Sequence, residues 1–85
     1  MRIPPRYDRA NEHNYSFRIY SNDTLHWCMM SDMQPHQQCA SIIQRLGGEA
    51  RELARLMTPQ ELMNGGQLNG NAVDPVTLLF HALQT

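Results

Sequence analysis

The sequence contains no lysine, and its seven basic residues are all arginines. Without lysine the chain cannot form a Schiff base or the phosphate-binding loop in which a lysine reaches the β- and γ-phosphates. It also has no apolar run that approaches the roughly 20 residues needed to span a bilayer, so we expect no membrane segment. The N-terminal residues lack the apolar stretch of a secretory signal peptide, and we therefore expect a cytoplasmic location.

Composition and charge narrow the function classes further. With 41% hydrophobic and 18% charged residues among 85, the chain matches neither a disordered nor a membrane protein. A chain of this length buries only about 60–65% of its unfolded surface, so its core is marginal unless a partner covers more of it. The formal net charge is −1, and both signs are spread along the chain. We therefore expect nucleic-acid contact to be indirect, apart from a weak contact through the arginines of the N-terminal tail.

The spacing of apolar residues predicts a mainly α fold, a small bundle of roughly four to five short helices. Residues 1–13 are rich in proline, asparagine and charge, and we expect them to form an extended lead-in. Residues 14–85 are expected to form a single helical domain. Within it, Phe17, Tyr20 and Trp27 recur at helical spacing and predict a first helix with one aromatic face.

Proline beside a capping residue marks where the later helices begin. The three expected starts are Pro35, Thr58–Pro59 with Glu61 at the capping-box spacing, and Asp74–Pro75. The second helix is expected to run to about Leu46. Between the last two helices, "NGGQLNGN" predicts a loop of glycine and asparagine. The last helix carries an apolar stripe of Val76, Leu79, Phe80 and Leu83 that is still running at Thr85, so we expect this helix or its packing to continue further.

Two adjacent glycines interrupt a stretch of helical periodicity, "IIQRLGGEARELARLM". In one continuous helix they would cost about 2 kcal/mol relative to alanine. We therefore predict an elbow between two helices, in which Gly47 takes the left-handed conformation after the first helix and Gly48 caps the next. In the helix that follows the two glycines, the residues that face inward would be Ala50, Leu53 and Met57.

Four residues of the zinc-binding types, His26, Cys28, His36 and Cys39, fall within one short stretch. On a helix, residues two apart point to different sides, so His26 and Cys28 cannot easily share a metal. His36 and Cys39 are three apart and are the better candidates for metal ligands. The ordinary alternative is that the cysteines are small buried hydrophobes and the histidines lie at the surface. We expect no metal and no cofactor, and a disulfide would be unusual in a reducing compartment.

Catalytic signals are missing as well. Gly65 and Gly70 have the spacing of a phosphate-binding loop, but Asn71 and Ala72 stand where that loop needs lysine and serine or threonine. No nucleophile lies in a recognisable elbow, and no pair of carboxylates is suggested by spacing. We therefore expect no catalytic residues and no enzyme activity.

Methionine is frequent, with six residues, three of which cluster at the end of the first expected helix. Met29, Met30 and Met33 allow two interpretations. They could line an interaction surface, because methionine packs adaptably against different partners. They could also fill gaps in an imperfect core, which is the commoner role of such residues.

Several segments together resemble the capsid region of retrotransposon Gag proteins over roughly Pro4 to Phe80. They are "PPRYD", the tryptophan of the first helix, "HQQCASIIQRL" and "LGGEARELA". In that family a Leu–x–Gly–x–Ala signature joins two helices of an all-helical capsid domain. Here the residues of the signature and its surroundings are Trp27, Leu46, Gly47, Gly48, Ala50 and Leu53.

The resemblance implies a non-enzymatic structural segment of a Gag-like polyprotein. Such a segment would self-associate with other Gag copies through helix–helix contacts. RNA packaging would belong to the full-length protein, through regions downstream of this chain. The alternative function is a small helical adaptor or regulatory protein that binds a partner's amphipathic helix through Met29–Met33. A small zinc-dependent module is the third hypothesis.

Overall fold

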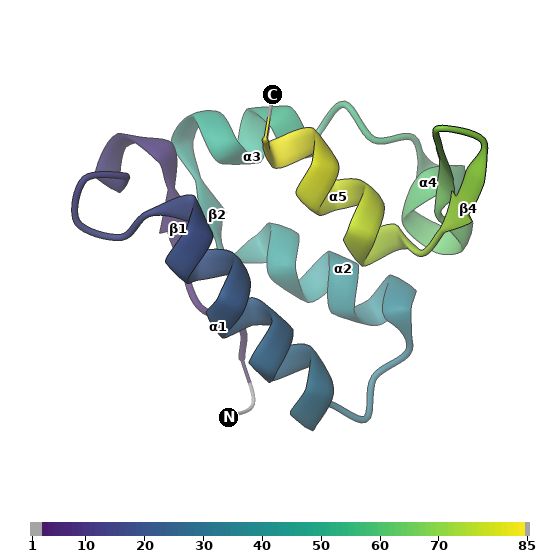
Figure 1. Cartoon of the computed structure of the whole chain (residues 1–85), viewed down its shortest axis with the longest axis horizontal. Coiled ribbons are helices and arrows are strands. Elements are labelled where there is room, and N and C mark those ends of the chain that lie inside the picture. Colours follow the sequence, from purple (N-terminus) through teal and green to yellow (C-terminus); the bar gives the residue numbers. More distant parts are fainter. Residues whose placement is uncertain (1–2, 85) are drawn as a thin grey trace.

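Helices make up most of this chain, which confirms the predicted mainly α fold (Figure 1). The computed structural model describes residues 3–84, so the expected continuation past Thr85 lies outside the described residues. The structure is 60% helical, and its described part contains five α-helices, four of them of seven residues or more. The elements are β1 (Tyr7–Asp8), the 3-10 helix η1 (Arg9–Asn11), α1 (Phe17–Met30), α2 (Pro35–Gln44), β2 (Leu46–Gly47), α3 (Gly48–Ala54), α4 (Pro59–Asn64), β3 (Gly66–Leu68), β4 (Asn71–Val73) and α5 (Pro75–Leu83).

The predicted helix starts are confirmed where a side chain caps the helix. At α4, the Glu61 amide donates to Thr58 Oγ1 at 3.1 Å, and the Thr58 amide donates to Glu61 Oε1 at 2.9 Å. At α5, the Thr77 amide donates to Asp74 Oδ1 at 2.8 Å. Each bond satisfies a backbone or side-chain group that would otherwise lack a partner at the helix end. These caps explain why both helices start at the predicted residues.

The core lies where α5 packs against α2, with α3 near the C-terminal end of α5 and α4 near its N-terminal end (Figure 1). The aromatic face predicted for α1 is confirmed, since Tyr20, Thr24 and Trp27 are buried. The core also contains Tyr7, Cys39, Ile42, Leu46, Ala50, Ala54, Met57, Val76, Leu78, Leu79 and Leu83. Because α2, α3 and α4 all pack against α5, Leu78 is buried in addition to residues of the apolar stripe predicted for α5.

The N-terminal segment contributes to this core, which its composition did not indicate. Tyr7 is 4% exposed and stacks on Tyr20, with ring centroids 4.6 Å apart. Its amide donates to the Arg45 carbonyl at 3.2 Å, and β1 pairs in parallel with β2. The Arg45 guanidinium Nε in turn donates to the Pro4 carbonyl at 3.2 Å. The lead-in is therefore fastened across the end of α2.

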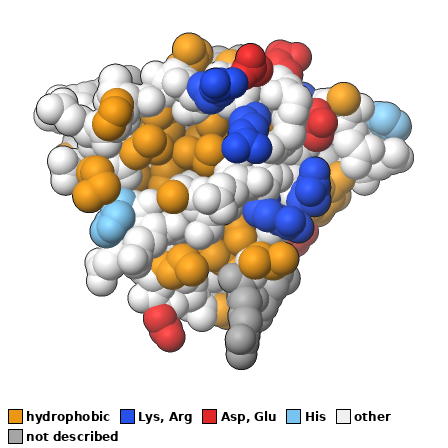
Figure 2. Space-filling view, turned by 180° about the vertical axis from the view of Figure 1, so that it is seen from behind, with side chains coloured by type: hydrophobic (Ala, Val, Ile, Leu, Met, Phe, Trp, Pro, Cys, Tyr) orange, Lys and Arg blue, Asp and Glu red, His pale blue; other side chains and the backbone are white. Residues whose placement is uncertain are grey.

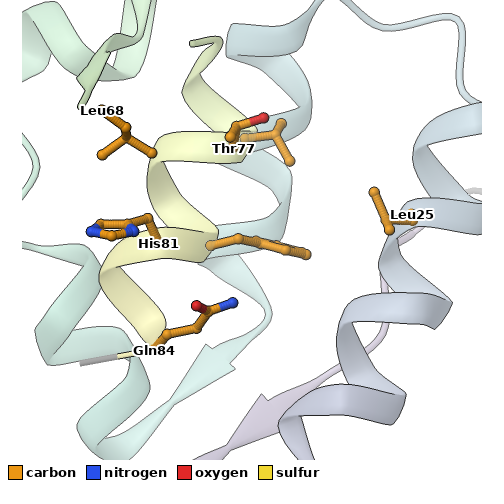
Figure 3. Close-up of a pocket in the computed structure, with 7 residues that line it drawn as sticks. Leu25, Leu68, Thr77, His81 and Gln84 are labelled. Carbon is orange, nitrogen blue, oxygen red and sulfur yellow. The ribbon is translucent and has the colours of Figure 1, made fainter. Parts of the chain in front are cut away.

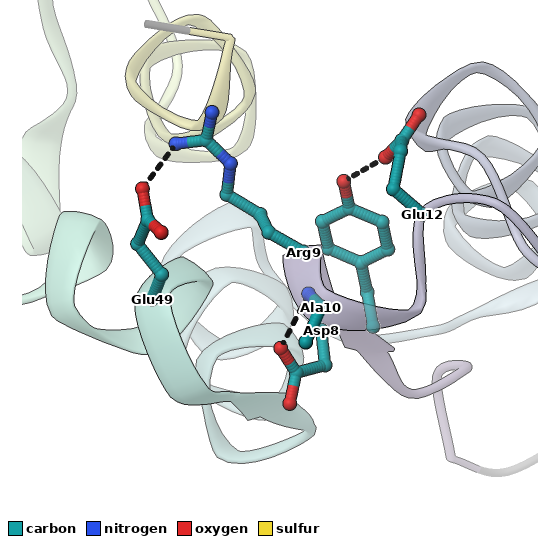
Figure 4. Close-up of polar contacts among 6 residues, drawn as sticks. Asp8, Arg9, Ala10, Glu12 and Glu49 are labelled. Carbon is teal, nitrogen blue, oxygen red and sulfur yellow. Dashed lines mark hydrogen bonds and ion pairs between the residues drawn. The ribbon is translucent and has the colours of Figure 1, made fainter.

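A carboxylate also ties the lead-in to α1. The Tyr7 hydroxyl donates to Glu12 Oε1 at 2.5 Å (Figure 4). The Phe17 amide donates to Glu12 Oε2 at 3.1 Å. The bond from Tyr7, together with the bond from Phe17, holds the pKa of Glu12 below its ordinary value. Burial, and then the bond to Glu12, raise the pKa of Tyr7 to about 12.

Glu12 is expected to make the stability fall at acid pH. Its folded pKa lies below the ordinary 4.5, so its stabilising contribution is complete above pH 4.5 and is lost as the pH falls through the folded pKa. Glu12→Gln, which cannot ionise, should flatten that part of the curve of thermal midpoint against pH, measured between about pH 3 and 6. Tyr7→Phe, which removes the hydroxyl donor, should also flatten the acid part of this curve. An acid limb unchanged in both variants would contradict this role.

The predicted elbow between two helices is confirmed, but the two glycines have exchanged roles. Gly47 is extended, with φ −123° and ψ 164°, and is the N-cap of α3. Gly48 takes the left-handed conformation, with φ +53°. The assignment was wrong because Gly47 pairs with Asp8 in the β1–β2 ladder, which requires extended backbone and moves the turn one residue on. The pairing also ends α2 at Gln44, before the predicted limit at Leu46.

The predicted loop of glycine and asparagine is wrong for most of its length, because β3 and β4 form an antiparallel hairpin. Leu68 pairs with Asn71 across a two-residue turn. Asn69 and Gly70, the turn residues, have φ of +53° and +83°. Positive φ at both positions characterises the type I′ turn, for which Asn-Gly is the preferred sequence.

Candidate interaction surface

The candidate metal ligands are not gathered into a metal site. Cys39 is completely buried, and its thiol lies 3.7 Å from the Pro75 carbonyl oxygen, to which it donates. Burial, and then the charge of Asp74, raise the pKa of this thiol to about 11. His36 is half-buried on α2. Within residues 3–84, no group of three His, Cys, Asp or Glu side chains could hold a metal ion, and both cysteines are free thiols.

Most of the predicted signature residues meet at the elbow. Leu46 and Ala50 are buried on either side of Gly47 and Gly48, whereas Leu53 is half-buried. The neighbouring Asp8 carboxylate leaves little space there, because a Cβ on Gly48 would lie 2.8 Å from Asp8 Oδ1. Trp27, the remaining signature residue, lies apart from the elbow in the sequence and belongs to the buried face of α1. The signature residues are thus mainly structural in this fold.

Three methionines form an exposed apolar cluster at the end of α1, which we call the methionine surface: Met29, Met30 and Met33. Their exposed fractions are 82%, 68% and 41%. The interpretation of these residues as gap fillers of the core is therefore wrong. Met29 and Met30 occupy the last turn of α1, and Met33 follows in the connection to α2, where Ser41 Oγ donates to its sulfur at 3.7 Å.

An apolar groove runs between α1, β3 and α5. Its volume is about 340 Å³. It is lined by Leu25, Leu68, Val76, Thr77, Phe80, His81 and Gln84. Figure 3 shows Leu25 on α1 across from α5, with Leu68 and His81 on the far side of α5. Burial of apolar groups in such a groove is the interaction that its lining favours.

Leu25 connects the groove with the methionine surface. It precedes Met29 by four residues, so the two side chains lie on the same side of α1. Leu25 is 51% exposed although it lines the groove. Sequence reasoning missed both Leu25 and Leu68. The four-residue spacing to Met29 was the available signal for Leu25, and the Asn69–Gly70 turn was the signal for Leu68.

The arginines and carboxylates of the described residues lie outside the lining of the groove. Figure 2 shows arginines gathered on the face opposite to the one seen in Figure 1, beside carboxylates and apolar side chains. The ion pairs Arg9–Glu49 (3.1 Å, Figure 4) and Arg55–Glu52 (3.3 Å) lie at the surface, with only Arg9 half-buried, and contribute little stability. The described residues that line the groove include no carboxylate and no guanidinium. A ligand there would be held by apolar contact rather than by ion pairing.

No helix within residues 3–84 has the length and apolar character needed to cross a membrane. Comparison of the chain with protein-family models, with curated proteins and with solved structures gives no match.

Proposed function

We propose that this chain is a non-enzymatic helical association domain, of the kind found in the capsid region of retrotransposon Gag proteins, and that it binds further copies of itself. The observation that carries this proposal is the exposed methionine surface, of which Met29 lies on the same side of α1 as Leu25 of the apolar groove. RNA packaging would belong to regions of a full-length protein beyond this chain.

This surface offers apolar burial that favours association. Covering one methionine side chain completely is worth about 1.5–3 kcal/mol, and flexible thioethers adapt to the shape of a partner. Met29 and Met30 retain most of their exposure in the single chain, so nearly all of this energy is gained only when a partner covers them.

Two further features favour a second copy as that partner. The formal net charge of −1 means that two copies repel each other only weakly. In addition, Leu46, Gly48 and Ala50 lie at the junction of two helices, which is where the resemblance to Gag capsid regions expects its signature. Repeated contacts between identical copies could close into rings or extend into open assemblies.

Charging the methionine surface should disrupt this association. The double variant Met29→Glu, Met30→Glu places carboxylates where a partner would cover apolar surface, so we expect the self-association constant to weaken at least about tenfold. Sedimentation velocity over a series of protein concentrations measures this constant. Met63→Glu is the matched control, because Met63 is 57% exposed on α4 and lies outside the surface.

An unmodified protein that stays monomeric at every concentration would contradict self-association. So would an equal loss in the Met63→Glu control.

The groove favours one alternative function, the binding of a partner's amphipathic helix. In that case the protein would be monomeric, and an amphipathic helical peptide would shift the NMR signals of Leu25 and Leu68.

A further inference from the structure

The five methionines that the structure describes differ widely in access to solvent. Met29 is 82% exposed and Met30 is 68% exposed, whereas Met57 in the core is 9% exposed. Met63 and Met33 lie between these limits, at 57% and 41%. An oxidant in solution must reach the sulfur of a thioether to react with it, so reactivity should follow this order of exposure.

The hydrogen bond to Met33 separates this residue further from its two neighbours. Ser41 Oγ donates to Met33 Sδ at 3.7 Å and so engages electron density that the sulfur would use in an attack. No such donor to Met29 or Met30 is found within residues 3–84. Met29 and Met30 are therefore the two most exposed methionines of the described chain, and neither sulfur accepts a hydrogen bond there.

We propose that Met29 and Met30 are a peroxide-sensitive modification site that controls association through the methionine surface. This regulatory role rests on the proposed function. The co-reactant is a hydroperoxide, ROOH. The thioether sulfur attacks the terminal peroxide oxygen, the S–O bond forms and the O–O bond breaks. The hydroperoxide proton is transferred to the leaving alkoxide oxygen, so sulfur is oxidised to a sulfoxide and the peroxide is reduced to ROH.

The consequence follows from the polarity of the product. A sulfoxide carries a strong hydrogen-bond acceptor, which would lose its water on contact with a partner's apolar surface and find no donor there. Because Met29 and Met30 contribute nothing to the buried core, oxidation should leave the domain folded while it weakens association at least tenfold. Methionine sulfoxide reductases reverse the modification, so the site can act repeatedly.

The test treats the purified chain with hydrogen peroxide and maps oxidation by mass spectrometry of peptides over time. We expect Met29 and Met30 to react several-fold faster than Met33 and at least tenfold faster than Met57. Sedimentation velocity on the same samples should show the tenfold weaker association. The thermal midpoint, measured at a dilution at which the protein is monomeric, should stay unchanged. In the double variant Met29→Leu, Met30→Leu the association constant should not change on peroxide treatment, whatever its value before treatment. Met63→Leu should respond to peroxide as the unmodified protein does.

The outcomes separate this site from the proposed function. Association that persists after Met29 and Met30 are shown to be oxidised overturns the regulatory role and leaves the proposed function standing. The regulatory role is also overturned if peroxide weakens association equally in the Met29→Leu, Met30→Leu variant, or if all methionines are oxidised at one rate. A protein that is monomeric before treatment overturns both. Recovery of association on enzymatic reduction supports the site.

Discussion

Trp27→Ala is expected to lower the free energy of unfolding by about 3–5 kcal/mol. Trp27 is 1% exposed and is the largest fully buried side chain of the described chain. Its removal deletes apolar contact and leaves a cavity that the surrounding helices can only partly fill. A domain of this size has a total stability of only about 4–13 kcal/mol, so the loss would remove a large share of that stability.

Urea denaturation followed by circular dichroism measures this loss. The neighbouring His26 is exposed on the same helix, so His26→Ala is the matched control and should stay within about 0.5 kcal/mol of the unmodified protein. A midpoint that does not change in Trp27→Ala would mean that α1 does not pack on the core as described.

Gly65→Ala is the second substitution with a large expected effect. Gly65 has φ +79° and ψ −157°, a conformation that is essentially restricted to glycine. A Cβ at this position would lie 2.0 Å from the Val73 carbonyl oxygen. That oxygen belongs to the backbone of β4, so relief of the clash requires the hairpin to move away from α4. We expect a loss of about 3 kcal/mol or more, measured by thermal unfolding.

Gly70→Ala provides the comparison, because it shares the positive φ but not the crowding. Gly70 has φ +83°, and a Cβ there would meet no atom within 4 Å. The substitution should cost only the conformational strain, about 1–2 kcal/mol. Equal losses in the two variants would show that backbone conformation alone, without the contact to Val73, determines the effect.

The features that could be predicted from the sequence are those set by neighbouring residues. Thr58 and Glu61 form the predicted capping box, and Asp74 caps the last helix, because each bond joins residues within one turn. The helical spacing of Tyr20 and Trp27 likewise identified the buried face of α1. Local chemistry was therefore enough to predict the fold class and the starts of α4 and α5.

Features set by distant residues could not be predicted in this way. The burial of Tyr7 and the conformations of Gly47 and Gly48 all depend on the pairing of β1 with β2, for which neither segment carries a sequence signal. The hairpin is a different case, since Asn69–Gly70 was a visible signal. It was overlooked because the flanking residues of β3 and β4 include glycine, glutamine and asparagine, which are not typical of strands.

The sequence indicated the methionines of the candidate surface but not their exposure. Periodicity shows which residues share one side of a helix, but it does not show where the partner elements end. Met29 and Met30 lie in the final turn of α1 with most of their surface uncovered, whereas Met57 lies beyond α3 and is buried. Similar residues therefore have opposite environments, and only the tertiary arrangement distinguishes them.

The pairing of β1 with β2 also bears on how fast the domain folds. The two strands are separated in the sequence by all of α1 and α2, whereas the caps and the hairpin form between near neighbours. Bringing distant segments together costs more loop-closure entropy than forming a helix, and contacts of this kind slow folding. We therefore expect the folding rate to be limited by the meeting of the first strand with the second rather than by the formation of any helix.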